Sequence, residues 1–421
     1  MSEEAKKKFD ERLTRINHAI AMDEEPDRVP LIPNALTYPI LHQGHTVAQA
    51  LYDIKLASDD FDKYLLEYEP DMANDWDGLF AGQGPIFEKA GLKWLRWAGE
   101  PGVDIDPNSI HQYIEKAYME EDEYDELNTD MTGWILNKYL PRSFKEFEPL
   151  AKVSFNGMSG YGWTAGTIPF ADPEVQKAFR VLGECGQMYL QWVDEFDKYQ
   201  THVEQDLGFP IMSGAQVTIP FDQISDFLRG TLGTMMDVMM QPDAVKEAME
   251  RFYPKALGAT LAQAHAPFIH GQWVFIPLHK GFDGFLGPDQ YDEFYWPTFR
   301  RLIEDLVANG LTPYIYTEGK YDSRLERIAE LPAHKVVFHF EDVDMAEAKR
   351  IVGKDHCISG GFNTRLLESG TVQQVKDAVK EQFDICAPGG GYIFDVADTL
   401  DDCKPENVEA LFETAREYGV Y

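Results

Sequence analysis

The fold of this chain is decided by residues 312–353, which read "TPYIYTEGKYDSRLERIAELPAHKVVFHFEDVDMAEAKRIVG". Tyrosine, isoleucine, valine and phenylalanine predict a strand at 312–319 and a second strand at 335–342. A helical segment follows each strand; the first ends near Pro332 and the second at Gly353. Two strand–helix units joined by short connections predict neighbouring parallel strands.

The same alternation continues on both sides of this stretch. Further strands are predicted at 273–279, 357–363 and 391–397. Further helices are predicted at 289–310, 371–383 and 405–419. Five successive units of this kind imply a parallel sheet. In a chain of 421 residues, the α/β fold that best accommodates them is a closed (β/α)8 TIM barrel.

The N-terminal half of the chain is less regular. A charged N-terminal helix precedes a first strand in "DRVPLIP" (27–33), and longer helices are predicted at 172–199 and 222–265. Residues from about 100 to 150, with the acidic run "EEDEYDE", are interpreted as a solvated helical insertion. We therefore expect one domain over residues 1–421, a barrel with an N-terminal helical extension and this insertion.

The composition narrows the classes of partner. Lys and Arg number 38 against 72 Asp and Glu, a formal net charge of −34. Such a surface repels nucleic acid and anionic membranes, so neither is expected as a main partner. With no apolar run of about 18 residues and no apolar signal core, a cytoplasmic protein is expected. The four cysteines contain no CxxC pair, which argues against a zinc finger or a disulfide scaffold.

Polar residues stand at the ends of the predicted strands, where a (β/α)8 barrel places its active site. In chain order they are His279, Lys280, Glu318, His339, Glu341, Asn363, Asp395 and Asp398. Strand alternation puts His339 and Glu341 on one face, and Glu318 ends the preceding strand, so we expect these three to converge. An imidazole with carboxylates suits Zn²⁺ or another divalent Lewis acid. A metal-free histidine–carboxylate hydrogen bond is equally compatible with this pattern.

Several stretches resemble the uroporphyrinogen decarboxylase superfamily. They are "EPDRVPLIP", "LRGTLGTMMDVMMQPDAVKEAM", "FYWPTFRRLIEDLVANG", "GGFNTRLLESGTVQQVKDAVKE" and "GGGYIFDVADTLDDCKPENVEAL". The resemblance covers nearly the whole chain and is strongest from about residue 210 onward. It implies a (β/α)8 barrel and one of two activities, porphyrinogen decarboxylation or cobalamin-dependent methyl transfer.

The decarboxylase branch matches less well. The decarboxylases have an arginine-rich N-terminal motif. The stretch that follows "DRVPLIP" here, "NALTYPILHQGHTVAQALYDIK" (34–55), contains no arginine. At the last strand they show an "NxGHG" pattern, and here "DVADT" puts Asp398 where the histidine would stand.

The methyltransferase branch commonly binds zinc through His-x-Cys-Gly and a later cysteine. Here the tetrapeptide is "YTEG", so Tyr316 and Glu318 replace the histidine and the first cysteine, and "DVADT" occupies the loop of the second. In lacking both thiolates, the sequence resembles the aryl methyl ether O-demethylases of anaerobic bacteria. Glu318 and His339 are 21 positions apart, a Glu-x20-His spacing like that of the veratrole-type members.

The resemblance implies a corrinoid-dependent methyltransferase that demethylates an aryl methyl ether of veratrole or guaiacol type. The methyl group would pass to Co(I) of a separate corrinoid protein, because the chain lacks the DxHxxG signature of a cobalamin-binding domain. Catalytic and metal-ligating roles, with zinc as the expected metal, fall to Glu318, His339 and Glu341. Substrate-binding roles fall to His279, Tyr316, Asn363, Asp395 and Asp398.

Two other functions remain open from the sequence. One is a decarboxylase-like enzyme acting on another carboxylate, and the other is a non-catalytic barrel that serves as a binding module. The oligomeric state is also open, with a homodimer as one alternative.

Overall fold

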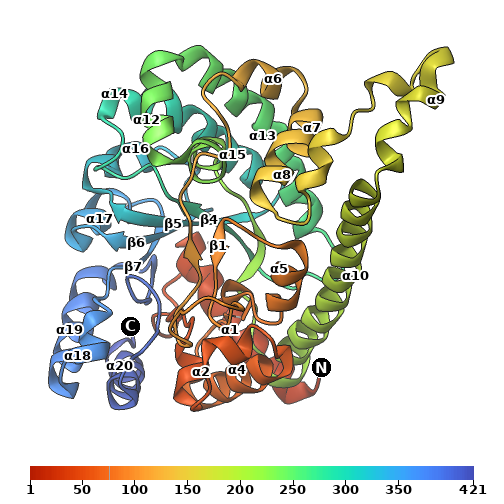
Figure 1. Cartoon of the computed structure of the whole chain (residues 1–421). Coiled ribbons are helices and arrows are strands. Elements are labelled where there is room, and N and C mark those ends of the chain that lie inside the picture. Colours follow the sequence, from red (N-terminus) through yellow and green to blue (C-terminus); the bar gives the residue numbers. More distant parts are fainter. Residues whose placement is uncertain (75) are drawn as a thin grey trace.

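The computed structural model describes residues 1–74 and 76–421, without the side chains of Asn156 and Ser213 (Figure 1). At its centre is a parallel sheet in which each strand is hydrogen-bonded to the next in sequence. In order, the strands are β3 (Ser213–Gln216), β4 (Trp273–Leu278), β5 (Thr312–Lys320), β6 (Val337–Asp342), β7 (Cys357–Gly360) and β8 (Tyr392–Ile393). The strands predicted from residue 273 onward are therefore confirmed.

Two further segments close this sheet into a barrel without forming regular strands. Leu31 makes a parallel bridge with Phe394, just after β8. Ala73 makes a parallel bridge with Ile211, just before β3. The amide of Asp71 donates to the carbonyl of Leu31 at 2.7 Å and so joins the two segments. The closed ring is the (β/α)8 barrel that the sequence predicts.

Helices surround the barrel (Figure 1). Those in its second half are α15 (Trp296–Ala308), α16 (Leu325–Ile328), α17 (Met345–Ile351), α18 (Arg365–Ser369), α19 (Val372–Cys386) and α20 (Pro405–Tyr418). The residues at the N-termini of two of these helices explain where the helices begin. Thr371 and Gln374 form a capping box at the start of α19, and Pro405 occupies the first position of α20.

The barrel interior is filled by its own cluster of side chains. Inward-facing Trp273, Tyr314 and Val337 belong to it, and α1 (Glu3–Ala21) adds Ile16 and Ile20. The N-terminal helix therefore covers the N-terminal end of the barrel, which leaves the C-terminal end for a site.

Arginine side chains fix α1 to the barrel. Arg15 and Arg28 each place a guanidinium nitrogen 2.6 Å from a carboxylate oxygen of Asp71, which is 1% exposed. Because a buried carboxylate is stable only when paired, these contacts hold the N-terminal extension in place.

The segment predicted as a helical insertion is helical only in its second half. Residues 112–113 form β2 (Gln112–Tyr113), which pairs antiparallel with β1 (Leu95–Arg96). Helices begin at α6 (Tyr124–Thr129) and continue through α7 (Met131–Trp134) and α8 (Leu140–Ser143). Prolines at 101 and 107 disfavour helix in the first half.

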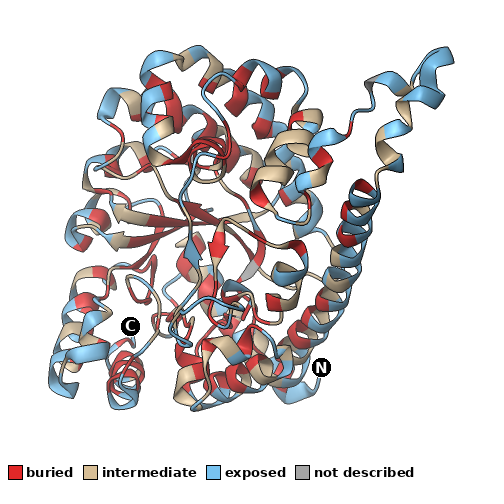
Figure 2. Cartoon of the chain, in the orientation of Figure 1, coloured by how far each residue is buried: buried red, intermediate tan, exposed pale blue. Residues whose placement is uncertain are grey.

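A projecting arm follows the insertion. In Figure 1, α9 (Trp163–Gly166) and the first turns of α10 (Pro173–His202) stand away from the barrel, and Figure 2 shows much of their surface exposed. No helix formed by the described residues is long and apolar enough to cross a membrane.

Candidate functional site

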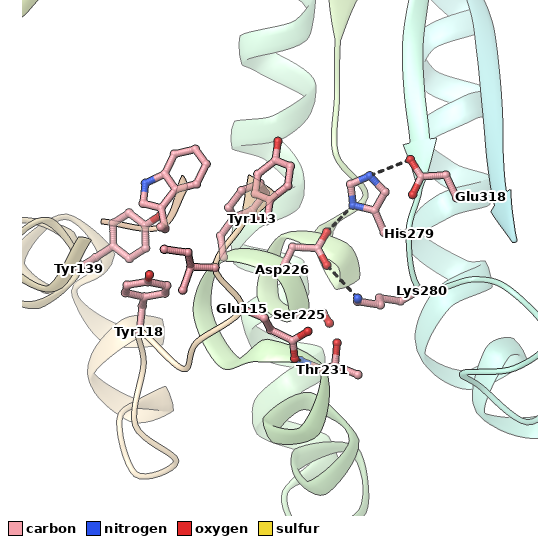
Figure 3. Close-up of a pocket in the computed structure, with 13 residues that line it drawn as sticks. Tyr113, Glu115, Tyr118, Tyr139, Ser225, Asp226, Thr231, His279, Lys280 and Glu318 are labelled. Atoms are coloured by element: carbon pink, nitrogen blue, oxygen red, sulfur yellow. Dashed lines mark hydrogen bonds and ion pairs between the residues drawn. The ribbon is translucent and has the colours of Figure 1, made fainter. Parts of the chain in front are cut away.

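A cavity of about 310 Å³ opens beside the C-terminal ends of β4 and β5 (Figure 3). Two walls of different chemistry face each other across it. One wall is aromatic and comes mostly from residues 94–139, and the other is polar and comes from the strand ends. The cavity therefore lies where barrel enzymes of this class place their chemistry.

The aromatic wall is a set of packed rings. Trp94 stacks on Tyr113 with centroids 5.8 Å apart, and Phe227 meets Trp94 edge-on at 5.9 Å. Tyr118 and Tyr139 lie further along the wall with centroids 6.4 Å apart. Such a wall can hold a flat aromatic ligand by stacking and edge contacts.

The polar wall is built around His279, which directly follows β4. Its Nδ1 lies 2.5 Å from Asp226 Oδ2, and its Nε2 lies 3.4 Å from Glu318 Oε1 (Figure 3). Lys280 Nζ is 3.4 Å from the other oxygen of Asp226. Burial alone would lower the pKa of His279, but the two carboxylate partners raise it to about 11. The imidazole is therefore a cation at neutral pH, with both ring nitrogens as donors.

A buried carboxylate fixes the end of β4. Asp222 accepts hydrogen bonds from the backbone amides of His279 and Lys280, both at 3.1 Å, and from the Tyr295 hydroxyl at 2.7 Å. Burial and the charge of Asp226 raise the pKa of Asp222, while these donors oppose the rise. The arrangement fixes the direction in which His279 leaves the strand.

Two π-helical turns contribute to this network. Asp226 lies on η8 (Ser225–Arg229), and Tyr295 ends η9 (Tyr291–Tyr295). The extra residue in a π-turn shifts the side chains that follow it, and such turns are frequent at functional sites.

His339 belongs to a second, deeper group. It is fully buried and stacks on Tyr316 with centroids 4.2 Å apart and planes 9° apart. Its Nδ1 lies 3.0 Å from the Tyr314 hydroxyl and 3.2 Å from Asp395, and its Nε2 donates to the carbonyl of Ala397 at 3.1 Å. Both ring nitrogens are thus engaged by the protein itself.

The three residues expected to bind a metal do not form one ligand set. Glu318 pairs with His279, whereas Glu341 accepts a hydrogen bond from the amide of Gly319. Across residues 1–74 and 76–421, no group of three or more His, Cys, Asp or Glu side chains is arranged to hold a metal ion. These donors do not fit zinc, so no step is assigned to a metal.

Two more of the predicted site residues, Asp395 and Asn363, lie in different places. Asp395 is buried and accepts hydrogen bonds from the amide of Asn34 at 2.8 Å and the hydroxyl of Tyr314 at 3.2 Å. Asn363 is exposed, and its side chain accepts from the amide of Arg365 at 3.1 Å, within the turn that begins α18. Asp395 therefore supports the buried group, and Asn363 supports a helix end.

Asp398 connects the two groups electrostatically. It is accessible to solvent, but the protein atoms crowded around it and the charges of Asp401, Glu341 and Glu318 raise its pKa to about 6. His339 acts in the opposite direction. Carboxylates are thus concentrated at this end of the barrel, which disfavours an anionic ligand.

Sequence reasoning missed the residues of the cavity that come from helices. Asp222 and Asp226 are four positions apart in "PFDQISDF", which places both on one face of a helix. That spacing was the signal in the sequence that could have revealed them. The aromatic wall was harder to predict from the sequence, because aromatic residues more often belong to a hydrophobic core than to a ligand pocket.

The fold and the site together define a barrel of the (β/α)8 class with a cavity at its C-terminal mouth. The family described as Uroporphyrinogen decarboxylase (URO-D) matches residues 202–418, which is just over half of the chain. The chain belongs to the uroporphyrinogen decarboxylase family.

Two further comparisons complete the picture. A methyltransferase from Methanosarcina mazei is similar in structure, with a TM-score of 0.61 over 97% of this chain and 98% of that chain. The two are 12% identical, so the likeness shows a shared fold. No curated protein matches this sequence.

Proposed function

We propose that this protein is a corrinoid-dependent methyltransferase that demethylates a small aryl methyl ether. One observation carries the proposal: an aromatic-walled cavity ends at an imidazolium held between two carboxylates, Asp226 and Glu318. Membership of the family and the fold shared with a protein named a methyltransferase support it.

The size of the cavity favours a small donor. Ligand pockets span roughly 300–1,000 Å³, and the cavity of about 310 Å³ lies at the lower end of that range. A single substituted benzene ring fits such a space, with its faces and edges against Trp94, Tyr113 and Phe227.

His279 supplies the proton that ether cleavage requires. A phenolate is a poor leaving group, so its oxygen must gain a proton as the methyl–oxygen bond breaks. The pKa of about 11 for His279 is close to that of a phenol, about 10. Proton transfer from Nε2 to the departing oxygen is therefore nearly balanced in energy, which is the condition for efficient general acid catalysis.

The two carboxylates have separate tasks in this proposal. Asp226 contacts Nδ1 and keeps the ring charged and oriented, while Lys280 stabilises Asp226 from its other oxygen. Glu318 contacts Nε2 and is 45% exposed, so it can move aside for the ether oxygen and then help to reprotonate the ring.

A corrinoid on a partner protein supplies the Co(I) nucleophile that accepts the methyl group. The macrocycle of a corrinoid is far larger than a cavity of about 310 Å³, so the partner must present it at the rim. The residues that meet the donor are those of the cavity walls, and the residues that meet the partner lie around its opening.

Decarboxylation of a porphyrinogen is less compatible with this site. The basic side chains among the described residues of the cavity wall are His279 and Lys280, and both are paired with Asp226. A substrate with many carboxylates would meet Glu115, Asp226 and Glu318 without enough cations to balance them.

The proposal is tested with the purified protein, Co(I) cobalamin and a panel of methoxybenzenes. We expect release of the corresponding phenol together with methylation of the cobalamin, followed by chromatography and by absorbance. Guaiacol and veratrole should react faster than vanillate, whose carboxylate meets an acidic site. Failure of every neutral methoxybenzene to yield a phenol would contradict the proposal.

A further inference from the structure

An apolar stripe faces solvent along α12 (Gly230–Met240). Its members, with their exposed fractions, are Leu232 (73%), Met235 (46%), Met236 (54%), Met239 (74%) and Met240 (76%). They follow the i, i+3, i+4, i+7, i+8 spacing that places residues on one face of a helix. A helix ordinarily turns such a face toward the core, so its exposure calls for a partner.

The orientation of α12 is fixed by a buried ion pair on its opposite side. Arg229 Nε lies 2.5 Å from Asp237 Oδ2, and the Tyr124 hydroxyl donates to the same oxygen at 2.9 Å. Asp237 is 2% exposed. Rotating α12 to bury its methionines would break this pair and leave a charge without a partner in the interior, which is strongly unfavourable. The fold therefore holds the stripe outward.

The stripe begins at the rim of the cavity. Thr231 lines the cavity, and its amide donates to Glu115, another lining residue, at 2.7 Å. Leu232, the first member of the stripe, is the next residue in the chain. A protein that covers the opening of the cavity would therefore meet α12.

We propose that this stripe is the docking surface for the corrinoid-carrying protein; the inference rests on the proposed function. The carrier must reach the rim, because the cavity is too small to admit the cofactor. The whole chain carries a formal net charge of −34, but the only charged residue within α12 is the buried Asp237. Contact there avoids charge repulsion and charge desolvation. Methionine side chains also adapt to different surfaces, which suits a carrier that binds and leaves in each cycle.

The experiment measures binding separately from chemistry. The variant Met235→Gln/Met239→Gln/Met240→Gln is compared with the wild type for affinity to a purified corrinoid-carrying protein from the same organism. We expect the dissociation constant to rise about tenfold or more. The rate of methyl transfer to free Co(I) cobalamin should remain unchanged, because none of the three residues lines the cavity.

A matched control variant is Leu66→Gln/Ile168→Gln/Leu190→Gln. These three apolar residues are 59%, 70% and 69% exposed and lie on α4 (Ile54–Tyr68), on the arm and on α10. We expect the control to bind the carrier as the wild type does.

Several results would overturn the docking surface: no binding of the carrier by the wild type, unchanged binding by the stripe variant, or equal weakening in the control. It would also be overturned if sedimentation showed a wild-type dimer that the stripe variant dissociates, since the stripe would then hold a second copy. A wild type that binds the carrier through the stripe but releases no phenol from any methoxybenzene would refute the proposed function and leave the docking surface standing.

Discussion

Replacing His279 by glutamine is the sharpest perturbation of the site. The change removes the imidazolium whose Nδ1 lies 2.5 Å from Asp226 and whose Nε2 lies 3.4 Å from Glu318. A glutamine amide cannot deliver a proton to a leaving phenolate. General acid catalysis contributes about 10²- to 10⁴-fold, so kcat for ether demethylation should fall by that factor. The corresponding loss of transition-state stabilisation is about 3–5 kcal/mol.

The same substitution should have a pH-dependent effect on stability. The pKa of His279 is raised from 6.5 to about 11 on folding, so the native state favours the protonated ring. Its contribution is fully present below pH 6.5 and is lost as the pH rises through 11. Leaving Asp226 without this donor should lower the free energy of unfolding by about 1–3 kcal/mol at neutral pH. The difference between variant and wild type should shrink above pH 10, as followed by urea unfolding.

His270→Gln is a matched control for this experiment. His270 also bridges two carboxylates, with Nδ1 2.5 Å from Glu204 and Nε2 3.3 Å from Asp197, but it precedes β4 at the opposite end of the strand. We expect a comparable loss of stability and no loss of methyl transfer. The role assigned to His279 would be refuted if its variant kept a near-wild-type rate, or if both variants lost activity equally.

Three further substitutions test other parts of the site. Glu318→Ala should lower the rate at least about 100-fold yet leave the thermal melt nearly unchanged, because the carboxylate is 45% exposed; a normal rate with a normal melt would rule out its role. Asp398→Asn should be more stable than the wild type at pH 7, since a pKa raised from 3.8 to about 6 means that ionisation opposes folding. That gain should vanish below pH 4, and a variant less stable at pH 7 would contradict the assignment. Trp94→Ala removes the ring that stacks on Tyr113 and should raise KM about tenfold with little change in kcat.

The second half of the barrel could be predicted because each strand there is a short buried run of β-forming residues between helix boundaries. The strand predicted at 27–33 is not a regular strand in the structure, and the second barrel segment, around Ala73, was not predicted at all. Pro30 and Pro33 lack the amide donors of a ladder, so this segment forms isolated bridges at Arg28 and Leu31. The third strand, β3, was missed because glycine and polar residues make up three of its four positions.

Strand alternation alone was not sufficient to predict how Glu318 and His339 lie relative to each other. Tyr316 pairs with His339 in the sheet, so His339 lies two residues deeper than Glu318. The register then shifts between Thr317 and Lys320, where Gly319 has a φ of 78°. Here Glu341 accepts a hydrogen bond from the amide of Gly319 while Glu318 pairs with His279, and alternation alone cannot anticipate this arrangement.

The main residues that the sequence-based prediction of the site did not include are those on helices. Asp222 and Asp226 reach the end of β4 only because their segment packs there and includes a π-turn. The residues at strand ends can be found from strand prediction, but contributions of this kind depend on tertiary packing.

The central claim is that this barrel transfers a methyl group from an aryl ether, and its most direct measurement is a label balance. The protein is incubated with Co(I) cobalamin and a methoxybenzene that carries carbon-13 in its methoxyl group. We expect labelled methyl group on the cobalamin and free phenol in equal amounts, with no label exchanged with solvent. Carbon dioxide released from a carboxylate substrate, with no label transferred and no phenol formed, would contradict the claim.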